Sequence, residues 1–112
     1  MIEGNNVDQE KALLVGVIQP GMTESLIHEH LDELELLAET AGAKIAGRIT
    51  QRVSKINPAT FIGKGKAEEL LNQAKELGVK LIVFDDELSS GQIKNYHKIS
   101  ENVKVLDRSG LI

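Results

Sequence analysis

The apolar residues of this chain fall into short continuous runs that alternate with longer periodic stripes. Four runs are rich in branched aliphatic side chains, at residues 11–18, 44–50, 80–84 and 103–106. A continuous apolar run is typical of a strand that is buried on both faces, as in a parallel sheet. The runs therefore predict four strands in the interior of the protein.

Between these runs, apolar residues recur at helical spacing, which places one side of a helix against a core. Thr23 is suited to cap the first helix, and Ser89 with Gln92 has the spacing of a capping box at the start of the third. The stripes are Ile27, Leu31, Leu34, Ala38 and Ala41, then Ala67, Leu70, Leu71, Ala74 and Leu77, then Ile93, Tyr96 and Ile99.

The return from helix to strand has one design, in which a residue suited to positive φ precedes an apolar residue and a lysine. It occurs at Gly42-Ala43-Lys44, Gly78-Val79-Lys80 and Asn102-Val103-Lys104. With right-handed crossovers we expect an α/β fold of order β-α-β-α-β-α-β, with a small four-stranded, mainly parallel sheet and helices on both faces. The domain would span residues 11–112 after a flexible tail at 1–10, and we also consider a short extra strand at 60–62.

Composition restricts the class of protein. The chain has 112 residues, of which 41% are apolar and 27% are charged, as in one soluble globular domain. It has no cysteine, so disulfides and thiolate metal sites are excluded. The polar start does not resemble a secretory signal and no apolar run could cross a membrane, so we expect a cytoplasmic location. The apolar end at Leu111-Ile112 predicts either a terminal strand or the front part of a longer protein.

Positive charge is concentrated in one segment. Residues 41–67 hold six cations and no acid, whereas the rest of the chain has seven cations and seventeen acids. Separation of this kind indicates a face that meets a polyanion, because the summed field steers phosphate there. The six cations are Lys44, Arg48, Arg52, Lys55, Lys64 and Lys66.

The segment ends in Gly63-Lys64-Gly65-Lys66, at the start of the second predicted helix. Glycines let a backbone approach phosphate, helix amides point at it, and the lysines add charge. The plainer interpretation is a glycine-rich turn with solvated lysines. The match to a nucleotide loop is poor, because the spacing and the hydroxyl of a P-loop are missing and Glu68 replaces the third glycine of a dinucleotide fingerprint. Contact with an RNA backbone is favoured over a bound mononucleotide.

In open α/β sheets, ligands gather at the carboxyl ends of the strands. That edge should hold residues 19–21, the long loop 51–66, residues 85–87 and residues 107–109. A loop of that length is usually functional or mobile. We expect Arg52, Lys55, Lys64 and Lys66 to contact phosphate there, although Arg52 could instead form a salt bridge with a nearby acid.

The acidic group Asp85-Asp86-Glu87 follows the third predicted strand. It could bind Mg²⁺ or accept a phosphoryl group, but the acidic pair that such a site needs after the first strand is missing. We therefore expect Asp85 and Asp86 to brace the basic loop. His28 and His30 face different directions on one helix. We predict no catalytic residue and no metal site in this chain.

Four segments together resemble the N-terminal domain of HflX-type GTPases. The match extends over nearly the whole chain from about Lys11, and its most specific parts are the Gly-Lys-Gly-Lys block and Asp-Asp-Glu-Leu. Gly91 departs from the proline or alanine expected before Gln92. The segments are Thr50-Gln51-Arg52, residues 57–66, residues 84–89 with Gln92, and residues 106–112.

This resemblance implies a domain that is followed by a helical segment and a Ras-like GTP-binding domain. It implies a partner in the large ribosomal subunit and its RNA, and a link to splitting or rescuing stalled ribosomes. GTP and Mg²⁺ are implied for the parent protein through its C-terminal G domain, and no cofactor is expected for this chain. The alternatives are an ATP-binding module that uses Gly63–Lys66, and a protein–protein module that pairs through the apolar C-terminal end.

Overall fold

The computed structural model describes residues 10–111 and contains four strands, three α-helices and one short 3-10 helix in this part of the chain. The tail predicted at residues 1–10 lies outside the described residues, apart from Glu10. The elements are β1 (Lys11–Ile18), α1 (Glu24–Thr40), β2 (Lys44–Arg52), α2 (Lys64–Glu76), β3 (Leu81–Phe84), α3 (Ser90–Ile99), β4 (Lys104–Leu106) and η1 (Ser109–Leu111).

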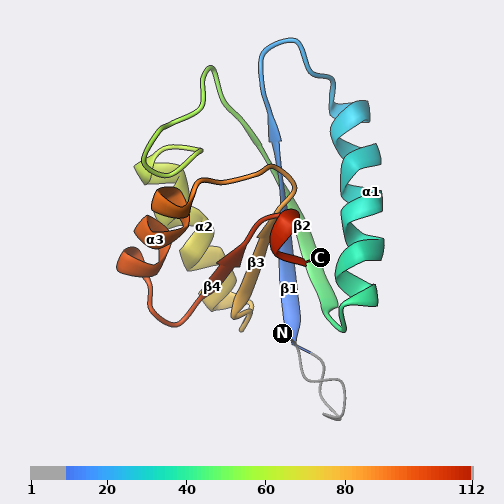
Figure 1. Cartoon of the computed structure of the whole chain (residues 1–112), viewed down its shortest axis with the longest axis vertical. Coiled ribbons are helices and arrows are strands. Elements are labelled where there is room, and N and C mark those ends of the chain that lie inside the picture. Colours follow the sequence, from blue (N-terminus) through green and yellow to red (C-terminus); the bar gives the residue numbers. More distant parts are fainter. Residues whose placement is uncertain (1–9, 112) are drawn as a thin grey trace.

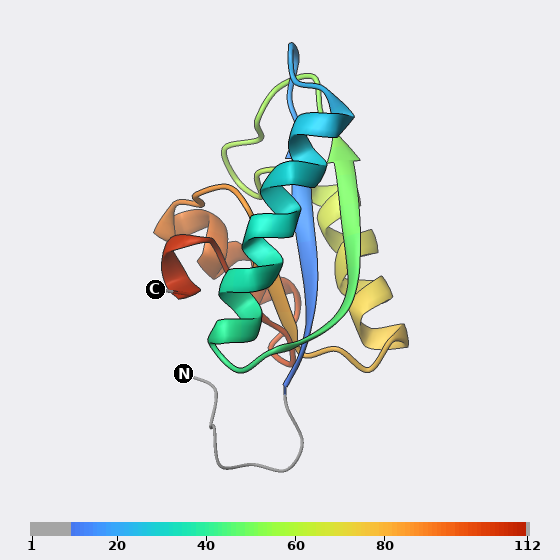
Figure 2. The same cartoon turned by 90° about the vertical axis from the view of Figure 1, so that its right-hand side faces the viewer.

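The strands form one parallel sheet in the order β2-β1-β3-β4. Helix α1 covers one face, and α2 and α3 lie on the other (Figure 1; Figure 2). The predicted fold class and element order are therefore confirmed. Because the strands are parallel, their carboxyl ends meet at one edge, which is the upper edge in Figure 1.

The side chains of β1 alternate between two cores. Leu13, Val15 and Val17 pack with α2 and α3, whereas Ala12 and Leu14 pack with α1. Every residue of β1 after Lys11 is buried, as the continuous apolar run predicts. Of the five predicted positions of the first stripe, helix α1 buries Ile27, Leu31, Leu34 and Ala38, whereas Ala41 is half-buried at the C-cap. Helix α2 buries Ala67, Leu70, Leu71 and Ala74.

The predicted helix ends are largely confirmed. The Thr23 side chain accepts a hydrogen bond from the backbone N–H of Leu26, and Ser89 and Gln92 form a complete capping box. Gly42 and Gly78 adopt φ of 99° and 69°. The third return is different, because α3 ends at Ser100 in an extended conformation and Asn102 has no positive φ.

Three further predictions need correction. The last positions of two stripes are exposed rather than buried: Leu77, one residue after the end of α2, is 53% exposed, and Ile99, the last residue of α3, is 38% exposed. Residues 60–62 add no strand to the sheet, since Phe61 pairs back to Asn57 in an isolated bridge. Leu111 belongs to η1 and packs against the α1 core rather than continuing a strand. Ile112 lies outside the described residues.

Candidate nucleic-acid interface

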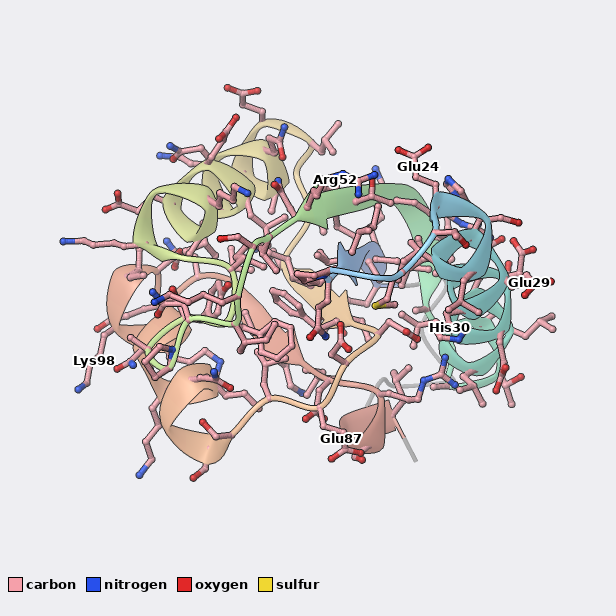
Figure 3. All side chains as sticks on the ribbon, turned by 90° about the horizontal axis from the view of Figure 1, so that it is seen from above. Glu24, Glu29, His30, Arg52, Glu87 and Lys98 are labelled. Atoms are coloured by element: carbon pink, nitrogen blue, oxygen red, sulfur yellow. The ribbon has the colours of Figure 1, made fainter. Side chains whose placement is uncertain are left out.

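The carboxyl edge of the sheet brings together the β1–α1 turn, the loop at residues 53–63, the segment after β3 and the segment after β4 (Figure 1). Figure 3 looks onto this edge. The loop connects the end of β2 to the start of α2, so it lies between Arg52 and the Gly63–Lys66 turn. The edge predicted from the sequence as the site of ligand contact is therefore where the loop and its cations lie.

Exposed cations lie at both ends of this loop. Lys55 and Lys64 are exposed, and neither forms an ion pair with another residue of the described part of the chain. The Arg52 side chain is 64% exposed and lies 3.4 Å from Glu24, which is itself 69% exposed; Figure 3 shows the two side by side. An ion pair this open to solvent contributes little energy, so Arg52 is easily released to another anion.

Lys66 has a different environment from its neighbours. Its Nζ donates a hydrogen bond of 2.5 Å to the backbone carbonyl of Arg52, and its side chain is half-buried. This bond ties the first turn of α2 to the end of β2. Lys66 therefore contributes local order to this edge, and its charge lies beside the end of β2.

The remaining cations of residues 41–67 do not join this edge. Lys44 lies at the amino end of β2, at the opposite end of the strand from Arg52. Arg48 faces α1, where its guanidinium donates to Asp32 at 2.7 Å and to Glu35 at 3.0 Å. The prediction of one free basic face is therefore wrong for Lys44 and Arg48. At the carboxyl edge Lys55 and Lys64 are exposed without an ion pair among residues 10–111, whereas Arg52 forms the salt bridge that was its alternative, with Glu24.

The start of α2 is built without a cap. Gly63 occupies the N-cap position with φ of 95° and makes no side-chain capping bond, and no acid stands in the first turn. A β-carbon placed on Gly63 or Gly65 would meet no other atom within 4 Å. Open amide donors, two lysines and free approach to the backbone are the features that favour a phosphate group.

Helix α3 holds the loop in place through its side chains. The Gln92 amide donates to the carbonyl of Asn57 at 2.9 Å, and the Asn95 amide donates to the carbonyl of Ala59 at 2.8 Å. The Tyr96 hydroxyl donates to the carbonyl of Thr60 at 2.7 Å. Burial raises the pKa of Tyr96 far above its usual range, so this hydroxyl remains a donor.

The prediction that Asp85 and Asp86 brace the loop is wrong. The Asp85 carboxylate binds Arg108, whose Nε lies 3.1 Å from Oδ1, and a short contact from Arg108 Nη2 reinforces the pair. Arg108 also reaches Glu33 and the carbonyl of His30 on α1. The acids at the end of β3 therefore fix the segment after β4, because Arg108 projects between them and α1.

Asp86 has no such partner. Its Oδ2 is buried without a hydrogen bond, and burial, together with the charge of Asp85, raises the pKa of Asp86 from 3.8 to about 6. His30 Nδ1 lies 3.5 Å from Asp85 Oδ2. Residues 10–111 nevertheless contain no group of three histidine or acidic side chains arranged to hold a metal ion.

Sequence reasoning missed Asn95 and the Tyr96 hydroxyl as contributors to this edge, and it placed residues 107–109 there without predicting that Arg108 pairs with Asp85. The apolar stripe of the third helix predicts that Tyr96 faces the core, which is correct for its ring but does not account for the hydrogen bond of its hydroxyl. Gln92 was identified only as a capping residue, yet one of its amide atoms caps α3 and the other holds the loop. The position of Gln92 three residues after Ser89 indicates the capping role, but no sequence pattern indicates its bond to the loop.

A cavity of about 660 Å³ lies at the other end of the sheet, between α2 and α3. Its lining includes Leu71, Val79 and Val103, and none of its lining residues belongs to Gly63–Lys66. It therefore offers no enclosed space for a nucleotide at the predicted phosphate site. No helix among the described residues is both long and apolar enough to span a bilayer.

Comparison with solved structures shows the same fold in larger proteins. A GTP-binding protein from the archaeon Sulfolobus solfataricus in complex with GDP superposes with a TM-score of 0.64 at 19% identity, covering 91% of this chain and 28% of that one. A mutation variant of SsGBP gives a TM-score of 0.67 at 17% identity, covering 89% and 30%. At these identities the likeness supports the fold alone.

Sequence comparison is more specific. The chain is 43% identical over 112 residues to a GTPase HflX of Flavobacterium psychrophilum, covering all of this chain and 27% of the relative. It is 35% identical over 103 residues to the GTPase HflX of Escherichia coli, covering 92% and 23%. The chain thus spans about a quarter of the length of these curated relatives. Residues 28–112 match the family model described as GTP-binding GTPase N-terminal, so the chain belongs to this family and corresponds to the N-terminal part of HflX.

Proposed function

We propose that this domain docks an HflX-type GTPase onto the large ribosomal subunit by binding ribosomal RNA. The parent protein would split or rescue stalled ribosomes, with GTP and Mg²⁺ bound in a C-terminal G domain outside this chain. The domain itself would supply no catalytic group. Its partners would be the RNA on one side and its own G domain on the other.

The observation that carries this proposal is the pairing of exposed cations with an uncapped helix start. Arg52, Lys55 and Lys64 are exposed around one loop, and the N-terminus of α2 next to them has no side-chain cap. Phosphate oxygens accept hydrogen bonds from both kinds of donor. The chain as a whole carries a net charge of −4, so this edge is the part suited to a polyanion.

Charge reversal at the exposed lysines tests the proposal. Lys55→Glu with Lys64→Glu changes no ion pair within residues 10–111, so the fold should be retained. We expect the intact protein to sediment less with purified large subunits. Because each phosphate contact adds about one unit to the dependence of log K on log salt, the variant should also show a smaller salt slope. Lys64→Glu with Lys66→Glu should weaken binding too, with some loss of local order at Arg52.

The matched control is Lys80→Glu with Lys104→Glu. Both residues are exposed at the amino edge of the sheet, and the change in net charge is the same. This control should bind large subunits like the unmodified protein. Equal sedimentation of the Lys55/Lys64 variant and the control would refute the proposal.

The uncapped start of α2 also suits the phosphates of ATP, which is the alternative function for Gly63–Lys66. Here the ligand would lie on an open surface rather than in a cavity. Titration of this chain with ATP and Mg²⁺ by calorimetry separates the two hypotheses. A heat of ATP binding that disappears in Gly63→Ala would favour the nucleotide module. The absence of binding heat at millimolar ATP would exclude that module.

A further inference from the structure

The loop at residues 53–63 is held by hydrogen bonds that its own sequence does not supply. Three side chains on one side of α3 donate to the backbone carbonyls of Asn57, Ala59 and Thr60. Each bond joins residues that are 35 or 36 positions apart. Helix α3 therefore determines the shape of the loop from outside it.

The loop also closes on itself. Asn57 and Phe61 exchange two backbone hydrogen bonds of 2.9 Å, and the Asn57 side chain accepts from the amides of Ala59 and Thr60. Phe61 adopts φ of 69°, a conformation that a bulky residue keeps only when its surroundings enforce it. The surroundings do enforce it, because Phe61 is only 6% exposed and its ring meets the ring of Phe84 edge-on, with 6.1 Å between the ring centroids.

The result is a loop whose backbone is fixed while its charged neighbours are free. The backbone acceptors of residues 57, 59 and 60 face α3, whereas Lys55, Pro58 and Ala59 are exposed to solvent. A loop that is ordered before binding avoids the entropy cost of being ordered by its partner. Fixed spacing between Lys55 and Lys64 also favours one arrangement of phosphates over others.

We propose that Gln92, Asn95 and Tyr96 are positioning residues that preorganise this loop for RNA, an inference that rests on the proposed function. Asn95 is the most informative of the three. Gln92 also caps α3, and Tyr96 also packs its ring against Phe84, whereas the only side-chain hydrogen bond of Asn95 within residues 10–111 goes to the loop.

The test compares Asn95→Ala and Asn95→Ala with Tyr96→Phe in the intact protein. Hydrogen exchange of the Ala59, Thr60 and Phe61 amides should become faster than in the unmodified protein. Binding to purified large subunits should weaken by about tenfold in the double variant, because loop order is now acquired on binding. The salt slope should stay unchanged, because all cations remain. Asn72→Ala, an exposed asparagine on α2, is the neutral control and should change neither measurement.

The outcomes separate this inference from the proposed function. Faster loop exchange with unchanged binding overturns the positioning role and leaves RNA docking intact, provided that Lys55→Glu with Lys64→Glu still weakens binding. Unchanged exchange overturns the inference too, because α3 would then not hold the loop. If the lysine variant also binds normally, both fail. Asn95 is half-exposed, so Asn95→Ala alone leaves the core intact. The single variant can therefore replace the double variant in both measurements if the double variant does not fold.

Discussion

Arg108 and Asp85 form an ion pair that joins the segment after β4 to the end of β3. The Asp85 side chain is only 8% exposed and that of Arg108 25%, so the pair is largely removed from water. Arg108 also reaches Glu33 and the His30 carbonyl on α1. One guanidinium thus links three separate parts of the fold at the carboxyl edge.

Replacing Arg108 should cost stability, because Asp85 would keep a buried charge without a partner. We expect Arg108→Met to lower the free energy of unfolding by about 2–4 kcal/mol, measured by urea denaturation. Arg52→Met is the control, since its pair with Glu24 is exposed on both sides and should be worth at most about 1 kcal/mol. Equal losses in the two variants would contradict the assignment of Arg108 as the structural link.

Asp86 should make stability depend on pH between about 4 and 6. Burial raises its pKa from 3.8 to about 6, so the folded state holds this proton more tightly than the unfolded state. The stabilisation is therefore complete below pH 4 and is lost as the pH rises through 6, by about 1–3 kcal/mol, since the carboxyl is only partly buried and solvent screens part of the effect. Asp86→Asn should remove this slope and be more stable than the unmodified chain at pH 7. Urea denaturation of both chains at pH 4, 5, 6 and 7 measures how the free energy of unfolding of each depends on pH. The same pH dependence in both chains would contradict this role of Asp86.

The two glycines at the start of α2 should respond in opposite directions. Gly65 is helical with open space around it, so Gly65→Ala should stabilise the fold by about 0.5–1 kcal/mol. Gly63 has φ of 95° and ψ of 149°, a conformation nearly restricted to glycine, so Gly63→Ala should cost about 1–3 kcal/mol.

Gly65→Ala also tests the interface. If RNA approaches the backbone here, the added methyl group should weaken binding to large subunits even though the fold becomes more stable. Thermal denaturation and sedimentation of the same preparation separate the two effects. Binding that rises with stability would argue against close approach at Gly65.

Gly16 should tolerate no larger side chain. A β-carbon there would lie 3.0 Å from Ile27 Cγ2 and 3.1 Å from Leu31 Cδ1, so α1 would have to move away from β1. We expect Gly16→Ala to lose about 1–3 kcal/mol in urea denaturation. Gly47→Ala on β2 is the comparison, because its nearest contact would be an ordinary 3.5 Å from Leu13. A neutral Gly16→Ala would show that the α1 packing is looser than these distances indicate.

The features that local sequence controls could be predicted. The strand at Lys11–Ile18, the Thr23 cap and the Ser89–Gln92 box each depend on residues within one element, and all are present. Leu77 was misassigned because helical spacing continues past the point where the chain turns. The order of the strands could not be predicted from the sequence, because it depends on which distant segments pair.

The site was harder to predict than the fold for the same reason. Charge alone located Lys55 and Lys64, which lie exposed at the carboxyl edge. Charge could not show that Arg48 would form ion pairs with acids of α1, or that Asp85 would pair with Arg108, 23 residues away. Nothing in the sequence around Asn95 identifies it as a donor to a loop 36 residues earlier.

The central position of β1 has a consequence for how this domain can be divided. The family match begins at residue 28, yet β1 is the strand that hydrogen-bonds to both β2 and β3. A recombinant fragment cut at residue 28 would leave those two strands with a gap between them and both cores open. We therefore expect a boundary taken from the family-model match alone to give an insoluble product, whereas one placed before Lys11 keeps the sheet whole.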